Sequence, residues 1–137
     1  MTTAETHAPV PVPDVDSAGY WEGARAGRLM LCRADHTGEW IHPPQELSSS
    51  GGPTHFEEVS GRGRIFSFIV VRQATVPGHR EPYVVGVIEL DEQPGLRLTG
   101  IINADPEIVE IGAAVRARLA EIGSSGFRAP EFDVIPD

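Results

Sequence analysis

The most constraining feature of this 137-residue chain is its second half, where short apolar segments alternate with turn residues. The segments are rich in β-branched and aromatic residues, which favour a pleated strand. In Ala114–Glu121, apolar and charged side chains alternate, as in a strand with one buried face. We therefore predict strands over His55–Ser60, Ile65–Arg72, Tyr83–Leu90, Leu96–Ile102 and Ala114–Glu121.

The number and order of these segments fit a small Greek-key barrel such as the OB-fold. Residues 105–112 are expected to form one helical turn before the last strand, with Asp105 as its cap. The length of the chain suits one domain with one hydrophobic core. The predicted fold class is mainly β, with a five-stranded OB-fold barrel in residues 54–137.

The N-terminal part is predicted to hold an arm and a short helix. Prolines at 9, 11 and 13 make residues 1–16 an extended arm, which is either disordered or lies along a partner. Asp16 or Ser17 can cap a helix that stops near Gly27 and uses Trp21 as its anchor. The helix opens the segment 17–53, whose remainder is rich in turn formers and has no periodicity.

Charge and cysteine content restrict the function further. A net charge of -9 with only 11 Lys and Arg residues disfavours nucleic acid and anionic membranes as partners. Cys32 is the single cysteine, so it forms no disulfide within the chain. The sequence shows no signal peptide and no apolar run of the roughly 18–20 residues that cross a bilayer. A cytoplasmic location is therefore expected.

Motifs that would carry catalysis are missing from the sequence. Gly61 and Gly63 precede a β-rich run rather than a helix, so we interpret them as a bend in a strand and not as a phosphate loop. No nucleophile elbow occurs, and Cys32 lies in an apolar run where a buried thiol is the usual outcome. A metal site built from Cys32, His36, His42 and His55 would match no standard zinc spacing.

The loop of residues 73–85 is the longest polar insertion between predicted strands, and long loops on a barrel often bind ligands. Arg72, His79, Arg80 and Tyr83 gather cationic and aromatic groups there. These four side chains could contact a phosphate or the adenine of coenzyme A, or a carboxylate of a partner. A solvated hairpin loop is the alternative interpretation.

Five pieces of the sequence, in this order, resemble the family known as domain of unknown function 35. They are YWEGARAGRL, a turn-rich segment with Pro43 and Pro44, EEVSGRGRIFSFIVV, PYVVGVIEL and DPEIVEIGAAVRA. The resemblance covers roughly residues 18–121. It implies an N-terminal helix, a rubredoxin-like zinc ribbon and a C-terminal OB-fold.

The ribbon departs from the family pattern at all four zinc ligands. Alignment on the glycines and prolines of the segment places Ala34, Thr37, Ser48 and Gly51 where the family has cysteines. Because tetrahedral zinc requires its ligands, we expect the metal to be absent. The ribbon is then held by packing or by a partner, or is mobile, with Trp40 and Ile41 as the residues that pin it.

The resemblance also implies a function. Similar proteins assemble with thiolase-like subunits of acyl-CoA metabolism, which supply the catalytic residues. We therefore expect a non-catalytic accessory subunit in a hetero-oligomer, with a coenzyme A thioester as a shared ligand and no cofactor of its own. Tyr20, Trp21 and Trp40 are the expected partner contacts.

Two other functions stay open at this point. The chain could be a stand-alone OB module that binds acyl-CoA, in which case it would be a monomer that binds coenzyme A without a partner. It could also be a nucleic-acid-binding OB domain with Phe66, Phe68 and Tyr83 as stacking residues. The net charge of -9 counts against the second alternative.

Overall fold

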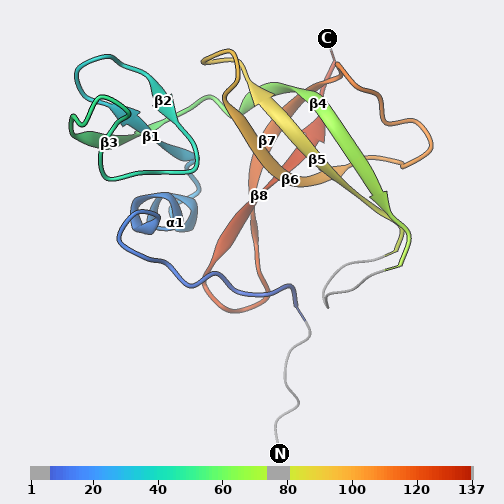
Figure 1. Cartoon of the computed structure of the whole chain (residues 1–137). Coiled ribbons are helices and arrows are strands. Elements are labelled where there is room, and N and C mark those ends of the chain that lie inside the picture. The colour runs from blue at the N-terminus through green and yellow to red at the C-terminus, as the bar shows by residue number, and fades with distance from the viewer. Residues whose placement is uncertain (1–6, 74–80, 137) are drawn as a thin grey trace, which may run out of the picture.

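The computed structural model describes residues 7–73 and 81–136, and within them the chain forms one helix and eight strands. In chain order the elements are α1 Ala18–Arg25, β1 Met30–Ala34, β2 Trp40–Ile41, β3 Thr54–Glu58, β4 Arg62–Val71, β5 Tyr83–Leu90, β6 Arg97–Asn103, β7 Ala114–Glu121 and β8 Arg128–Val134. They build a small three-stranded sheet beside a five-stranded barrel (Figure 1). The predicted mainly β fold class is confirmed.

The barrel has the strand order β4-β5-β6-β8-β7 and closes where β7 pairs with β4. All its pairs are antiparallel except β6 with β8, which run parallel from Ile101 opposite Glu131 to Asn103 opposite Asp133. This arrangement is the Greek-key topology of the OB-fold. A single turn lies before β7, in which the carbonyl of Asp105 accepts the amide of Val109 at 3.1 Å. The carboxylate of Asp105 caps this turn, as the sequence predicted, by accepting the amide of Glu107 at 2.9 Å.

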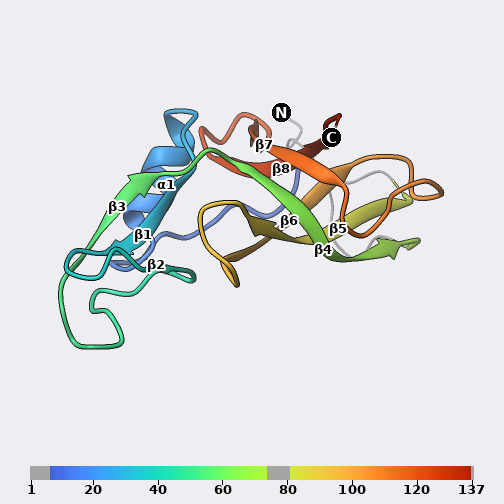
Figure 2. The same ribbon diagram turned by 90° about the horizontal axis from the view of Figure 1, so that it is seen from above.

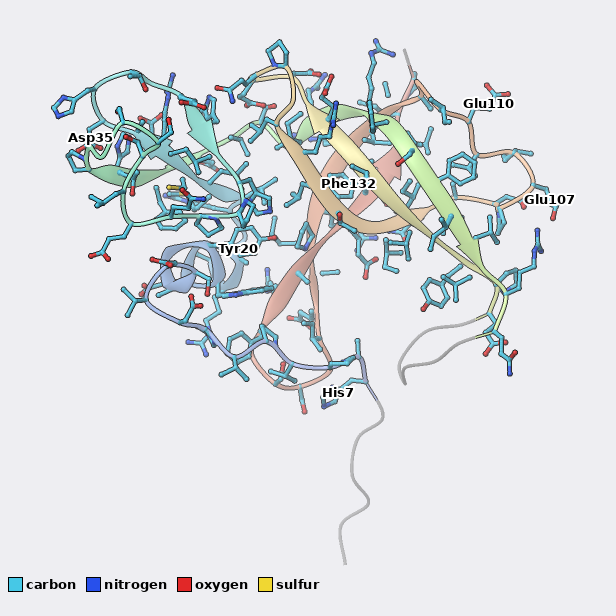
Figure 3. All side chains as sticks on the ribbon, in the orientation of Figure 1. His7, Tyr20, Asp35, Glu107, Glu110 and Phe132 are labelled. Carbon is cyan, nitrogen blue, oxygen red and sulfur yellow. The ribbon has the colours of Figure 1, made fainter. Side chains whose placement is uncertain are left out.

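The hydrophobic core fills the barrel because side chains alternate along its strands. In β5 every second residue is buried, which is the two-residue period of a strand with one face inside. Phe132 is fully buried and lies at the centre of the barrel (Figure 3). The side chains packed with it are Ile65, Val84, Ile88, Leu98, Ile102 and Val115.

Two strand predictions need correction. The strand expected over 55–60 forms as β3, but it pairs with β1 outside the barrel and not with the OB strands. The fifth barrel strand is instead β8, which was not among the predicted strands. Its residues pair with β7 over their whole length, from Arg128 opposite Glu121 to Val134 opposite Val115.

The bend expected near the start of β4 is present. Gly61 has φ +78° and its carbonyl accepts the amide of Ala117 at 2.8 Å, so β4 begins by turning onto β7. Gly63 lies where β4 passes closest to β5: a Cβ added there would be 2.3 Å from the carbonyl oxygen of Glu89. Both glycines therefore serve the close approach of strands.

Helix α1 packs against the three-stranded sheet through its glycines. A Cβ on Gly19 would be 2.5 Å from the ring of Phe56, and one on Gly23 would be 2.2 Å from Cγ of Met30. The helix starts after Ser17 and ends before Gly27, which has φ +80°. The predicted start and stop of the helix agree with this.

A glutamine side chain joins the three-stranded sheet to the barrel. Gln93, in the turn between β5 and β6, accepts the amide of Trp40 at 2.9 Å and donates to the carbonyl of Trp40 at 3.0 Å. Its amide group therefore pairs with β2 as a neighbouring strand would. Figure 2 shows the two parts side by side, with β1, β2, β3 and α1 at one end and the barrel at the other.

Candidate functional site

The three-stranded sheet and its loops, residues 30–58, keep the shape of a ribbon at the positions where the resemblance implies zinc. The two loops that would carry the ligands approach each other: the amide of Asp35 donates to the carbonyl of Pro53 at 3.1 Å. In the second loop, the hydroxyl of Ser48 accepts the amide of Gly52 at 3.1 Å and lies 3.0 Å from the hydroxyl of Ser50. These groups offer no thiolate or imidazole, so they do not fit a tetrahedral zinc ion.

The other potential ligands of the ribbon do not converge either. Cys32 is buried and its thiol donates to the carbonyl of Gln45 at 3.4 Å. Within residues 7–73 and 81–136, no three His, Cys, Asp or Glu side chains are placed to hold a metal ion. The absence of zinc stays a prediction that rests on the residue types of the ribbon.

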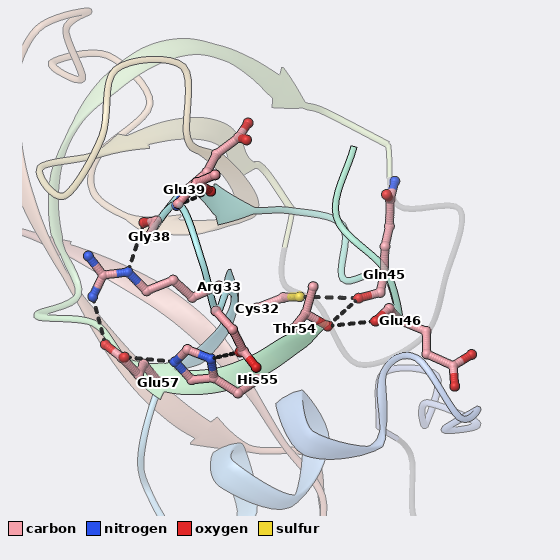
Figure 4. Close-up of polar contacts among 11 residues, drawn as sticks. Cys32, Arg33, Gly38, Glu39, Gln45, Glu46, Thr54, His55 and Glu57 are labelled. Atoms are coloured by element: carbon pink, nitrogen blue, oxygen red, sulfur yellow. Dashed lines mark hydrogen bonds and ion pairs between the residues drawn. The ribbon is translucent and has the colours of Figure 1, made fainter. Parts of the chain in front are cut away.

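A chain of charged side chains crosses the ribbon between β1 and β3 (Figure 4). Arg33 donates to the carbonyl of Gly38 and to the carboxylate of Glu57, both at 2.8 Å. His55 bonds Glu57 through Nε2 at 2.8 Å and Asp35 through Nδ1. The guanidinium of Arg33 also lies 4.6 Å from the ring centre of Trp40. These contacts link the first loop of the ribbon to β3.

The hydrogen bonds from His55 to Glu57 and Asp35 raise the pKa of the imidazole above its ordinary value of 6.5. The hydrogen bond between His55 and Glu57, together with the one from Arg33, lowers the pKa of Glu57 below its ordinary value of 4.5. A raised histidine pKa adds stability that is complete below 6.5 and is lost as pH rises through the folded-state pKa. The lowered pKa of Glu57 adds stability that is complete above 4.5 and is lost as pH falls through its folded-state pKa.

We therefore expect the ribbon to be held best between about pH 4.5 and 6.5, and to loosen as His55 loses its proton above this window. Neutral imidazole has one N–H, so only one of the two carboxylates can then accept a bond from the ring. Proton NMR titration of the His55 ring measures the pKa directly. Asp35→Asn should lower that pKa, and a wild-type pKa at or below 6.5 would contradict the prediction.

The three aromatic residues expected to contact a partner do not share one environment. Tyr20 and Trp40 are each 8% exposed and pack in the hydrophobic core of their own chain. Burial raises the pKa of Tyr20 to about 12. Tyr20, and not Trp21, is thus the residue that anchors α1 (Figure 3). Both rings are therefore largely buried within this chain, and their contact with a partner stays a prediction.

Trp21 keeps part of its side chain at the surface and borders three hollows. Its ring meets that of Tyr20 edge-to-face at 4.8 Å. One hollow, of about 510 Å³, lies between the arm, α1 and the outer side of β6 and β8. A second, of about 440 Å³, is bounded by Pro43, Pro44 and His42. Burial lowers the pKa of His42, and its Nδ1 is buried without a hydrogen-bond partner among the described residues.

The residues expected to meet coenzyme A are only partly described. His79 and Arg80 lie outside the described residues. Arg72 follows the end of β4, is 67% exposed and lies 3.8 Å from the carboxylate of Glu107. Tyr83 starts β5 opposite Val71, so Tyr83 and Arg72 lie at the same end of the barrel. The structure brings these two positions together and leaves their role as a prediction.

Two of the potentially reactive side chains, His55 and Cys32, are already bonded or buried. Both ring nitrogens of His55 bond carboxylates, so neither is available to take a proton from a substrate. Cys32 is 1% exposed. Arginines also have acidic partners at the surface, as in Arg97 with Glu89 and Arg118 with Asp133, which disfavours a groove for a phosphate backbone. No helix in residues 7–73 and 81–136 is long and apolar enough to span a membrane.

The chain combines a helix, a ribbon that lacks the four zinc-binding cysteines of the family, and a five-stranded OB barrel. These parts define its class as an OB-fold protein with an appended ribbon. Residues 56–120 match the family described as the C-terminal OB-fold domain of ChsH2. The chain therefore carries an OB-fold domain of the DUF35 and ChsH2 type, and the resemblance drawn from the sequence is confirmed.

Three known proteins illustrate the similarity. The 3-oxo-4,17-pregnadiene-20-carboxyl-CoA hydratase alpha subunit of Mycobacterium tuberculosis is 39% identical over 111 residues, 78% of this chain and 34% of that protein. A DUF35 domain-containing scaffold protein of Methanothermobacter thermautotrophicus is 38% identical over 69 residues, 49% of this chain and 50% of that protein. The solved structure of an Ltp2-ChsH2(DUF35) aldolase matches with a TM-score of 0.83 and 29% identity, over 91% of this chain and 98% of that chain.

These similarities differ in extent. The chain spans about a third of the length of the hydratase subunit, and nearly all of the chain in the aldolase structure. The named relatives are subunits or scaffolds of larger proteins and complexes.

Proposed function

We propose that this chain is an accessory subunit of an acyl-CoA enzyme complex, that it contributes no catalytic residue, and that its partner is a thiolase-like protein. The observation that carries the proposal is the match over 98% of a chain from an aldolase complex of Ltp2 and ChsH2. The engaged state of His55 and the burial of Cys32 support a non-catalytic role.

The proposal includes a coenzyme A thioester as a ligand shared with the partner, and no metal in the ribbon. Arg72 and Tyr83, at one end of the barrel, are the described residues that would face the thioester. In this role the OB barrel completes the wall of a site whose reacting groups lie on the partner. The chain itself binds and orients and does not carry out the reaction.

The test is purification of the tagged chain from the organism that encodes it, with mass spectrometry of co-eluting proteins and metal analysis of the same fraction. A thiolase-like protein in fixed stoichiometry, without zinc, is the expected result. The isolated chain should show no hydratase, thiolase or aldolase activity on acyl-CoA substrates. A monomer that binds coenzyme A without a partner would instead indicate a stand-alone acyl-CoA-binding module.

A further inference from the structure

The outer side of the sheet formed by β4, β5 and β6 is apolar, although the described chain does not cover it. In β5 the buried residues point into the barrel, so Val85 and Val87 point outward. A strand with one face in solvent normally places polar residues on that face, and a continuous apolar run is typical of strands covered on both faces. β5 is of the second kind.

The neighbouring strands extend this surface. Ile69 of β4 lies opposite Val85, and Val85 lies opposite Ile101 of β6, which places three branched apolar side chains in one row. Ile69 is 62% exposed and Phe66 is 47% exposed. We use the name apolar face for the outward side chains Phe66, Ile69, Val71, Val85, Val87 and Ile101.

Within the described residues, the N-terminal arm borders one edge of the apolar face, because His7, Ala8 and Pro9 line the same hollow as Ile101. Helix α1 contacts β1 and β8. In Figure 1 the strands β4 and β5 lie in front of the barrel, and in Figure 2 they lie at its outer edge. In both views, no helix or loop drawn in colour passes over them. Large contiguous apolar surfaces on soluble domains usually mark sites of association.

Charge decides between a second copy and a different protein as the occupant. A second copy would bring a net charge of -9 against a net charge of -9, which opposes association. Within the face, the guanidinium of Arg97 lies 3.8 Å from the ring centre of Phe66 and is paired with Glu89. Glu131, opposite Ile101 on β8, places at the rim a carboxylate that is paired with Arg118 at 3.7 Å. The fitting partner surface is therefore apolar at its centre and polar around it, on a protein without the strong negative charge of this chain.

We infer that the apolar face is the surface by which this chain docks on the thiolase-like subunit, an inference that rests on the proposed function. Trp21 extends the surface, because it borders the same hollow as Ile101 and Thr99. The partner then covers the outer side of β4, β5 and β6, whose apolar sequences are typical of strands buried on both faces.

The test uses Ile69→Asp, with Ile108→Asp as the matched control. Both isoleucines are exposed, at 62% and 72%, so neither change opens the core, but Ile108 lies in the loop before β7 and outside the apolar face. The probe is the Ltp2 component of the aldolase complex, with affinity measured by surface plasmon resonance. Ile69→Asp should weaken binding by about tenfold or more, as for a residue at the centre of an interface. Ile108→Asp should change it by less than about threefold.

Ile69→Thr keeps a β-branched side chain and provides a second variant that preserves the strand. It should weaken binding less than Ile69→Asp, with a melting temperature close to that of the wild type.

If the wild type and Ile69→Asp bind Ltp2 equally, the docking surface is wrong while the proposed function stands. If the wild type binds neither Ltp2 nor a thiolase-like subunit of its own organism, both the proposed function and the proposed occupant of the apolar face are wrong. If light scattering shows a dimer of the free chain that Ile69→Asp dissociates, the occupant is a second copy and the inference is overturned.

Discussion

Phe132→Ala is expected to lower the free energy of unfolding by about 3–5 kcal/mol, the range measured for large aromatic residues in cores. Phe132 is 0% exposed, and its ring packs among the inward side chains of the barrel. Close packing leaves the neighbouring strands little freedom to fill the cavity. Because small domains are stable by only about 5–15 kcal/mol, this one change should bring the chain close to unfolding at 37 °C.

Val134→Ala is the control for this change, because Val134 belongs to the same strand but is 45% exposed. Urea unfolding followed by far-ultraviolet circular dichroism measures both variants. The control should lose less than about 1 kcal/mol, as expected for a partly exposed valine. Similar losses for the two variants would show that β8 does not supply the centre of the core.

Gly63→Ala is expected to destabilise the barrel by about 3 kcal/mol, at the upper end of the usual cost of overpacking. The added Cβ would lie 2.3 Å from the carbonyl oxygen of Glu89. That atom belongs to the backbone of a paired strand, so the clash cannot be relieved by rotating a side chain. β4 would have to move away from β5 next to its contact with β7.

Gly86→Ala provides the comparison, because its added Cβ would meet the side chain of Ile102 at 2.2 Å and no backbone atom closer than 3.5 Å. Ile102→Val removes the clashing Cδ1 atom, so Gly86→Ala should cost less in that background than in the wild type. Thermal unfolding of the four proteins in this double-mutant cycle gives the coupling energy. If Gly63→Ala cost less than about 1 kcal/mol, the approach of the two strands would be looser than the structure places it.

The sequence allowed the strands with the strongest apolar runs to be predicted, and β5 and β7 match the structure residue for residue. β8 was missed because its sequence, RAPEFDV, contains a proline and few β-branched residues. Pro130 is tolerated because the pairing with β6 begins only at Glu131. β3 was assigned to the barrel because its pairing with β1 depends on a strand that was not predicted.

Prediction of the candidate site was more limited. The loss of metal ligands could be read from residue types, but the contacts of Arg33, His55 and Glu57 depend on which strands pair. The burial of Tyr20 and Trp40 within this chain could not be predicted, because aromatic content alone does not distinguish a core from an interface. A signal for the apolar face was present in the unbroken apolar runs around Ile69 and Val85, which lack the alternation of a solvated strand.

The position of β8 in the barrel has a consequence for synthesis of the chain. β6 and β7 each have one edge that only β8 pairs. On the ribosome, these edges stay open until residues 128–134 emerge, although the ribbon sheet and the β4–β5–β6 sheet can form before. Open strand edges are templates for pairing with other chains. The nascent protein is therefore expected to be most prone to aggregation, and most dependent on chaperones, in the interval just before its last strand is made.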